Sequence, residues 1–311
     1  MKNHAFLILA HKQPKLLARA LSALSASNHH FFINVDGKSN NYDEFVELIG
    51  KSNIPNVHFL EKRIKCYWGG ISLVDAEIEL LKAAKDYSVH FDYYHLISGQ
   101  DYPLRNNEQF DAFFEDTDDS FMCYDYEKNI NKERWKARLK RKTCQFYPNE
   151  SRPLWKMAFI GIFLYNPIGK WLFGGRKPIP NLASGWQWFS WSAIVVDYVL
   201  QYLETNPRYY RRFDHTGSPD EIFFNTLLYP QIDKLKIRKH FPLRYISWAT
   251  YRPIDTPKRP YNLNEQDYER VINSAAFFCR KVDEVESKTF LDMVDAQRNN
   301  KYNIAEHDYF I

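Results

Sequence analysis

Apolar runs alternate with helical patterns along the first hundred residues of the chain. The runs have the length of buried strands, and the segments between them have the spacing of amphipathic helices. The expected strands are residues 5–10, 31–36, 57–60 and 93–97, and the expected helices are residues 16–24, after a proline, and 72–84. Strands that alternate with helices in this way predict a parallel sheet with helices on both faces. The expected fold class is therefore α/β.

Polar clusters follow the predicted strands where a ligand would bind, because ligands of such sheets sit outside the carboxyl ends of the strands. The clusters are Ala10-His11, Val35-Asp36, Trp68-Gly69-Gly70-Ile71-Ser72 and Ser98-Gly99-Gln100-Asp101-Tyr102-Pro103. An acid such as Asp36 can accept hydrogen bonds from a ribose or a uracil imide, and Gly69-Gly70 lets backbone amides approach a ligand closely. Each cluster taken alone also fits ordinary turn chemistry.

The segment Gly217-Ser218-Pro219-Asp220-Glu221 holds two acids behind a turn and ahead of an apolar run. Ser218 is an N-cap residue by type, and Pro219 suits the first helical position. Asp220 and Glu221 should then lie in the first turn, where the helix dipole favours negative charge. The pattern fits both an ordinary helix start and a catalytic carboxylate held at one.

Composition excludes several classes of function. A net charge of +4 over 311 residues is too mild to indicate nucleic acid as a partner, but it suits an anionic small molecule bound at a local basic cluster. The sequence contains neither G-x-G-x-x-G nor G-x-x-x-x-G-K-[ST], which disfavours a dinucleotide-binding fold and a P-loop. The aromatic content of 17% fits either a large aromatic core or the binding of sugar rings.

The spacing of the cysteines and the hydropathy of the chain indicate the cellular compartment of the protein. Cys66, Cys123, Cys144 and Cys279 are far apart, so we expect free thiols in a reducing compartment and no zinc site. The apolar run near the N-terminus is too short for a signal peptide. Residues 154–165 are apolar but short and contain Lys156, which favours a buried or an interfacial helix. We expect a soluble cytoplasmic protein, with peripheral contact at the inner membrane surface left open.

Several blocks of the sequence resemble, in order, those of the core-2/I-branching β-1,6-N-acetylglucosaminyltransferases, the family that includes the peptide O-xylosyltransferases. The blocks are residues 5–36 (AFLILAHKQP…FFINVD), Trp68-Gly69-Gly70 with Ser72-Leu73-Val74, residues 95–104 (HLISGQDYPL), Ser218-Pro219-Asp220-Glu221 and Phe278-Cys279-Arg280-Lys281-Val282-Asp283. The similarity spans nearly the whole chain.

The resemblance implies a GT-A-type glycosyltransferase, with a mixed, mostly parallel sheet flanked by helices. It implies one domain over residues 1–311, with a nucleotide-binding half at 1–120 and an acceptor-binding and catalytic half at 121–311. The expected reaction transfers a sugar, GlcNAc or xylose, from a UDP-sugar to a glycan hydroxyl with inversion at the anomeric carbon. A bacterial member of this kind would build a cell-surface or secreted glycan at the cytoplasmic face.

The resemblance also implies roles for individual residues. Glu221 matches the catalytic base, and Lys281 matches a lysine that faces the UDP diphosphate. The residues expected at the donor are His11, Asp36, Trp68, Gly69, Ser72, Ser98, Gly99, Gln100, Asp101, Arg280 and Lys281, with Lys258 or Arg259 as a second basic contact. The residues expected at the acceptor are Arg134, Trp186, Asp220 and Trp248, of which Arg134 and Trp248 could equally be structural.

The sequence departs from the family pattern at residues 184–188 (SGWQW), where a Gly-Ser pair is more usual, and in lacking the cysteine framework and membrane anchor of the animal members. A rival from another class is a non-catalytic protein on the same fold that binds a nucleotide sugar or a glycan. Retention of Glu221 and Arg280-Lys281 argues against it, because pure binding needs no base.

Metal is the remaining question. The best D-x-D candidate is Asp116-Thr117-Asp118, which lies in an acidic turn away from any expected strand end, so we interpret it as a solvated loop. The family's branching enzymes work without metal, and two cationic side chains can supply a comparable charge to a diphosphate. No metal or other cofactor is expected. A nucleotidyltransferase or phosphotransferase would need an acid pair at a strand end, which the sequence does not offer.

Overall fold

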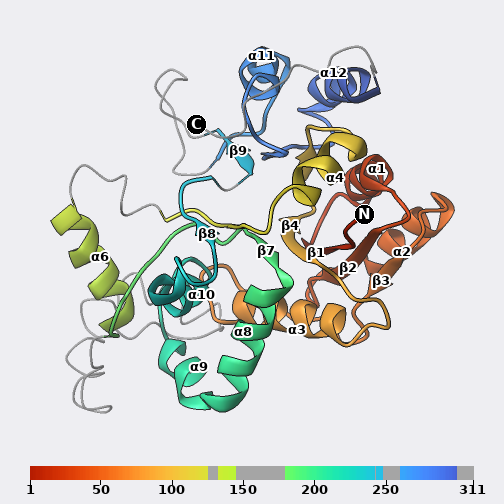
Figure 1. Cartoon of the computed structure of the whole chain (residues 1–311). Helices are drawn as coiled ribbons and strands as arrows, with labels where there is room; N and C mark the ends of the chain where they lie inside the picture. The colour runs from red at the N-terminus through yellow and green to blue at the C-terminus, as the bar shows by residue number, and fades with distance from the viewer. Residues whose placement is uncertain (125–131, 145–178, 242, 248–259, 300–311) are drawn as a thin grey trace.

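Figure 1 shows the protein as a computed structural model, which describes residues 1–124, 132–144, 179–241, 243–247 and 260–299. Seven strands form the central sheet, in the order β3-β2-β1-β4-β7-β6-β8. Their bounds are β1 His4–Ala10, β2 His29–Val35, β3 Val57–Phe59, β4 Tyr93–Ser98, β6 Ser120–Phe121, β7 Ser190–Ser192 and β8 Ile237–Arg238. The first four run parallel, β7 is antiparallel to both neighbours, and β6 is parallel to β8. The predicted α/β class with a mixed, mostly parallel sheet is confirmed.

Side chains of the central strand β1 alternate between two cores, as the period of a strand requires. Leu7 and its neighbours two residues away pack with α3 (Ser72–Lys85), α8 (Ala193–Thr205) and α10 (Phe223–Leu228). Phe6 and Ile8 pack on the other face with α1 (Pro14–Leu24), α2 (Tyr42–Lys51) and α4 (Asn107–Glu115). Figure 1 shows these two helix groups on opposite sides of the strands.

A smaller sheet closes the molecule beside α1. It has the order β5-β10-β9, formed by Asp101–Pro103, Phe278–Arg280 and Arg244–Ile246. Its core joins α1 to α11 (Tyr268–Ile272) and α12 (Lys288–Asn299). Strand β10 therefore carries the Arg280-Lys281 pair back toward the ends of β1 and β4.

The remaining elements lie around α8 and α10 or lead into α11. They are α6 Lys132–Cys144, α9 Pro207–Phe213, η1 Pro219–Glu221, η2 Tyr229–Gln231 and η4 Glu265–Asp267. In the part of the chain that the structure describes, no helix has both the length and the apolar character needed to cross a bilayer. The apolar segment 154–165 lies outside the described residues.

The strands and helices predicted in the first hundred residues are all present, but the prediction missed one helix, α2 at Tyr42–Lys51. The first two strands begin earlier than their apolar runs, at His4 and His29, because both imidazoles are buried in the sheet. All four cysteines are free, as expected.

The central position of β4 leads to a stability prediction. Leu96 is fully buried in the core that contains α3, so Leu96→Ala should lower the free energy of unfolding by about 2 to 5 kcal/mol through lost burial and a cavity. Ile194 is 68% exposed on α8, so Ile194→Ala should change it by about 0.5 kcal/mol or less. Urea unfolding of both variants measures the difference, and equal losses would contradict the packing described.

Candidate active site

Several residues predicted to bind the donor lie together where strands β1, β2 and β4 end, at the carboxyl edge of the central sheet. Ala10 pairs with Val35, and Leu9 pairs with Ser98, so the chain leaves the neighbouring strands β1, β2 and β4 at the same level. The amide of Asp36 donates to Ala10 O at 2.8 Å, and the amide of Gly99 donates to Leu9 O at 2.9 Å. The structure thus brings the regions of His11, Asp36 and Gly99 side by side, as the strand pattern predicts.

The carboxylate of Asp36 holds the next loop against this edge. Its Oδ1 accepts hydrogen bonds from the amides of Lys38 at 2.9 Å and Cys66 at 3.2 Å. Lys38 Nζ lies 3.4 Å from Oδ2. Since Cys66 precedes the Trp68-Gly69-Gly70 turn, Asp36 positions that turn beside the strand ends.

The same turn contacts the acidic motif. Ser72 Oγ accepts from the amide of Tyr67 at 2.9 Å, which closes the turn at the start of α3. Gly69 has a φ of 72°, a conformation that suits glycine, and its carbonyl accepts from the amide of Ser218 at 3.1 Å. The side chain of Trp68 is 77% exposed. The predicted donor loop and the predicted catalytic segment are therefore joined by a backbone hydrogen bond.

A buried ion pair lies beneath the loop that follows β4 at this edge of the sheet. Asp101 accepts from the amide of Ser98 at 2.8 Å, and its Oδ1 lies 2.9 Å from Arg280 Nη1, which also donates to Ser98 Oγ. Arg244 Nη2 lies 3.6 Å from the second oxygen of Asp101. Both guanidinium groups lie over the ring of Trp188, at 4.2 Å for Arg280 and 5.0 Å for Arg244.

The guanidinium of Arg280 therefore already forms an ion pair with Asp101 inside the protein. A bound ligand would share this positive charge with Asp101. Lys281 follows Arg280 at the end of β10. The turn at Gln100 holds this end in place, because the amide of Val282 donates to Gln100 O at 3.0 Å. Burial lowers the pKa of His11, and the charges of Lys12 and Lys281 lower it further against the opposing effect of Asp36. Asp36 and Lys281 are thus both close enough to His11 to act on its charge.

Glu221 lies at the end of η1 with its side chain 47% exposed. Lys142 Nζ, from α6, contacts Glu221 Oε2 at 2.9 Å. The backbone carbonyl of Glu221 accepts from the amide of Gly185 at 2.9 Å. A Cβ atom at Gly185 would lie 1.8 Å from Cys123 O, so the chain needs glycine there to approach this closely.

Asp220 points the other way, into a buried group of acids. Burial raises the pKa of the Asp220 carboxyl to about 7, and the neighbouring Glu221 charge adds to the effect. Burial also raises the pKa of Glu77 on α3 well above its usual range. Gln187 Nε2 donates to Glu77 Oε1 at 2.5 Å. The motif thus presents one carboxylate to solvent and keeps a second acid inside.

One detail of the sequence prediction is wrong. Ser218 has a φ of 51°, in the left-handed region, and its hydroxyl makes no capping hydrogen bond with any described residue of the turn. Pro219 does take the first position, but of the short 3₁₀ turn η1, which continues after Ile222 into α10. Asp220 and Glu221 do lie in a first turn, as predicted, but it belongs to a three-residue 3₁₀ helix and not to an α-helix.

The other residues singled out from the sequence fall into three groups. Trp186 is half-buried, and its amide donates to Cys123 O at 2.9 Å next to Gly185, which connects the unusual SGWQW segment to the site. Arg134 lies on α6, but its side chain is outside what the structure describes, as are Trp248, Lys258 and Arg259. The Asp116-Thr117-Asp118 turn lies at the opposite edge, because Tyr93 at the start of β4 donates through its hydroxyl to Thr117 O at 2.8 Å.

Sequence reasoning missed three residues of the site. Glu77 carries a readable signal, because it is an acid on the apolar face of α3 between Val74 and Leu81. Lys142 and Gly185 have no such signal, since only the fold brings them to Glu221. A separate cavity of about 620 Å³ between α8, α9 and η2 contains none of the predicted residues.

Known proteins resemble this chain over most of its length. The family model described as Core-2/I-Branching enzyme matches residues 4–272. Xylosyltransferase 2 of Rattus norvegicus is 26% identical over 96% of this chain and 34% of its own length. Beta-glucuronosyltransferase GlcAT14A of Arabidopsis thaliana is 26% identical over 86% of this chain and 58% of its own. The chain thus spans about a third of the first relative and just over half of the second.

Similarity to solved structures is weaker. The S. aureus protein TarS, solved in complex with UDP, aligns with a TM-score of 0.29 and 14% identity over 39% of this chain and 35% of that one. The family match is different in kind, because it includes every strand of the central sheet and the acidic motif at Glu221. The chain belongs to the Core-2/I-branching enzyme family.

Proposed function

We propose that this protein is an inverting glycosyltransferase that transfers a sugar from a UDP-sugar to a hydroxyl group of a glycan. The observation that carries the proposal is the contact between Ser218 and Gly69, which sets the half-exposed carboxylate of Glu221 beside the edge where the donor residues gather. Membership of the family supports the same conclusion.

In the proposed reaction, Glu221 is the general base. The acceptor oxygen attacks C1 of the sugar while its proton passes to the Glu221 carboxylate, and the bond between C1 and the diphosphate oxygen breaks so that UDP leaves. Lys142 contacts Oε2, which leaves Oε1 to receive the proton. Attack opposite the leaving group inverts the anomeric carbon.

The departing diphosphate needs positive charge on the far side of the sugar. Lys281 at the end of β10 is the candidate, with Lys258 or Arg259 as a second contact. Asp36 is proposed to accept hydrogen bonds from the uridine part of the donor. The ion pair with Asp101 gives Arg280 a positioning role for this corner of the site. We propose that these cations replace a metal ion at the diphosphate.

The transferred sugar is proposed to be xylose or GlcNAc. The relatives named as xylosyltransferases favour xylose, and the glucuronosyltransferase adds glucuronic acid to the donors worth testing. Trp186 beside Glu221 and the exposed Trp68 offer aromatic surface to a sugar ring. A protein that only binds nucleotide sugars is the alternative, and the base variant separates the two.

Replacing the base tests the chemistry. Glu221→Gln keeps the shape of the side chain but accepts no proton, so turnover should fall by about 10² to 10⁴ while donor affinity changes little. Transfer from UDP-xylose, UDP-GlcNAc and UDP-glucuronic acid to glycan acceptors measures this. Glu204→Gln, at an exposed position of α8, is the matched control and should retain full rate. Equal rates in the Glu221 variant and wild type would remove Glu221 from the mechanism.

Removing the proposed diphosphate contact tests the donor site. UDP should bind in the presence of EDTA, and Lys281→Ala should weaken its affinity about ten- to a hundredfold, the effect of losing one charge-assisted contact. Calorimetric titration measures both affinities. Lys288→Ala removes the same charge from an exposed position of α12 and should bind UDP like wild type. Binding that requires added Mn²⁺ would overturn the metal-free donor site.

The buried acid predicts a pH dependence of stability. Asp220 has a pKa of about 7 in the fold against 3.8 for an ordinary aspartate, so the folded chain retains a proton that the unfolded chain loses between these values. The free energy of unfolding of wild type should therefore fall as pH rises from 4 to 7. The Asp220→Asn side chain cannot ionise, so the free energy of unfolding of this variant relative to wild type should rise by up to roughly 4 kcal/mol between pH 4 and 7.

Urea unfolding at several pH values measures the difference between the two proteins. Glu77 remains in both, so its contribution cancels to a first approximation. Asp233→Asn changes an exposed aspartate and should track wild type at every pH. Parallel curves for wild type and Asp220→Asn would contradict the raised pKa.

A further inference from the structure

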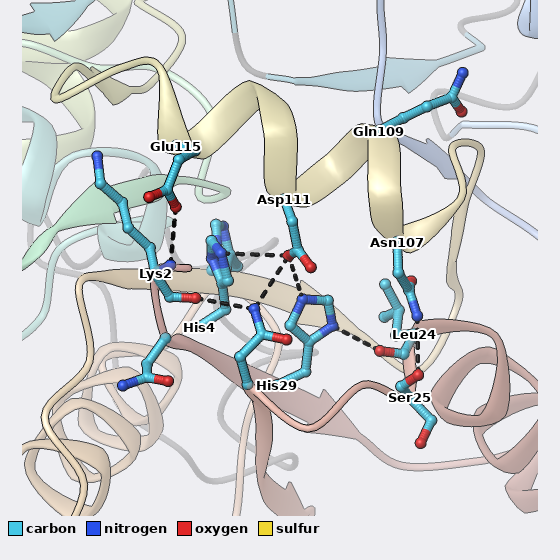
Figure 2. A network of polar contacts seen from close by, with 12 residues as sticks. Lys2, His4, Leu24, Ser25, His29, Asn107, Gln109, Asp111 and Glu115 are labelled. Carbon is cyan, nitrogen blue, oxygen red and sulfur yellow. Dashed lines mark hydrogen bonds and ion pairs between the residues drawn. The ribbon is translucent and has the colours of Figure 1, made fainter. Parts of the chain in front are cut away.

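Two histidines and an aspartate converge at the edge of the sheet opposite the proposed active site. His4 begins β1, His29 begins β2, and the two residues are register partners. Asp111 reaches them from α4, as Figure 2 shows. Both imidazoles are fully buried, and the Asp111 side chain is 15% exposed. None of these residues belongs to the reaction proposed above.

The hydrogen bonds of His29 require a proton or a metal ion between this residue and Asp111. Its Nδ1 lies 2.6 Å from Leu24 O, which can only accept, so Nδ1 carries the hydrogen and donates. A neutral His29 then has a lone pair at Nε2, and Nε2 lies 2.8 Å from Asp111 Oδ1. A lone pair and a carboxylate oxygen repel each other at that distance. A proton, carried by His29 or by Asp111, or a metal ion therefore has to lie between them.

His4 distinguishes the two possibilities. Its Nδ1 lies 3.0 Å from His95 Nε2, and His95 Nδ1 lies 2.9 Å from Ser190 Oγ, so both Nδ1 atoms can donate outward along this chain. His4 Nε2 lies 3.6 Å from Asp111 Oδ1 and has no hydrogen-bond partner among the described residues. A proton on His29 leaves this nitrogen without a partner, whereas a metal ion binds all three groups.

We propose that His4, His29 and Asp111 bind one divalent transition-metal ion, with zinc as the best match. Two imidazole nitrogens and a carboxylate oxygen are ligands that zinc prefers. Bonds of about 2.0 to 2.1 Å in a tetrahedron separate ligand atoms by about 3.3 Å, and the two contacts of Asp111 Oδ1, at 2.8 and 3.6 Å, lie on either side of that value. Because Asp111 is partly exposed, a water molecule can reach the metal and serve as its fourth ligand.

The surroundings of the three ligands match those of known metal sites. A ligating histidine usually donates its other ring N–H to a carbonyl or another acceptor, which orients the ring. Here Leu24 O accepts the hydrogen bond from His29 Nδ1, and His95 Nε2 accepts the hydrogen bond from His4 Nδ1. Asn28 Nδ2 lies 3.3 Å from Asp111 Oδ1 and supports the carboxylate.

The position of the site assigns the metal a structural role. Strand β1 runs from His4 to Ala10, so the ligands and the proposed donor edge lie about 20 Å apart, at opposite ends of the same strand. An ion bound here joins α4 to the paired strands β1 and β2, on which α4 otherwise packs through apolar side chains such as Phe110. Its removal should therefore lower stability and leave UDP affinity unchanged.

The test uses the full chain, stripped with EDTA and returned to chelator-free buffer. Addition of Co²⁺ should produce the visible absorption of a tetrahedral ion at one equivalent per chain, and Zn²⁺ should displace it and raise Tm. Asp111→Asn is the sharpest variant, because the asparagine amide can donate to neutral His29 Nε2 and preserve the fold. Its affinity for Co²⁺ and Zn²⁺ should fall by at least about a hundredfold, and its Tm should not respond to zinc. His58→Gln alters a half-buried histidine of another pair and should bind metal like wild type.

Two results would overturn the proposal. Equal metal affinity in wild type and Asp111→Asn would show that the ion binds elsewhere. Absence of Co²⁺ binding, together with a ¹⁵N spectrum in which His29 is doubly protonated, would assign the charge to a proton. UDP titration on the stripped protein keeps this question separate from the donor site, since metal-dependent UDP binding contradicts the proposed function and metal-dependent Tm alone does not.

Discussion

The pairing of β1 between β2 and β4 is the constraint on which the rest of the structure depends. Its parallel register ends the three strands at one level, and this brings the regions of His11, Asp36 and Gly99 together. The same register starts β1 and β2 side by side, which places His4 beside His29 at the other edge. Alternate side chains of β1 serve two different cores, so a slip by one residue would exchange the faces and disperse both polar sites.

Charge burial shapes the proposed active site around that framework. Asp101 is buried between Arg280 and Arg244, and removing one partner of such a group would leave an uncompensated charge. The arginines in turn lie on Trp188, so the corner that carries Lys281 is held by several interactions at once. A fixed cation suits a leaving diphosphate, because it needs no rearrangement at the moment the bond breaks.

The adjacent acids of the Ser218-Pro219-Asp220-Glu221 segment differ because their environments differ. Glu221 faces solvent and Lys142, which suits an ionised base. Asp220 faces Glu77 in the interior, where burial favours the protonated form. One short turn therefore places two carboxyl groups in different environments, in the way that enzymes assign different roles to neighbouring acids. The close approach of Gly185 to Cys123 O fixes the turn from behind.

The sequence by itself determined the α/β class, four strands and two of the three helices of the first hundred residues, and the residues expected at the carboxyl edge, because strand and helix periods and turn residues are local properties. The partners of those residues were decided by the tertiary structure. Lys142 contacts Glu221 across 79 positions, and Arg280 contacts Asp101 across 179. The buried His4 and His29 extend their strands beyond the apolar runs. Because histidine is polar, the hydrophobic pattern predicted neither these strand starts nor the contact of both residues with Asp111. Such contacts arise only when strands pair and helices cover them, since burial and charge at a residue depend on neighbours that are remote in the chain.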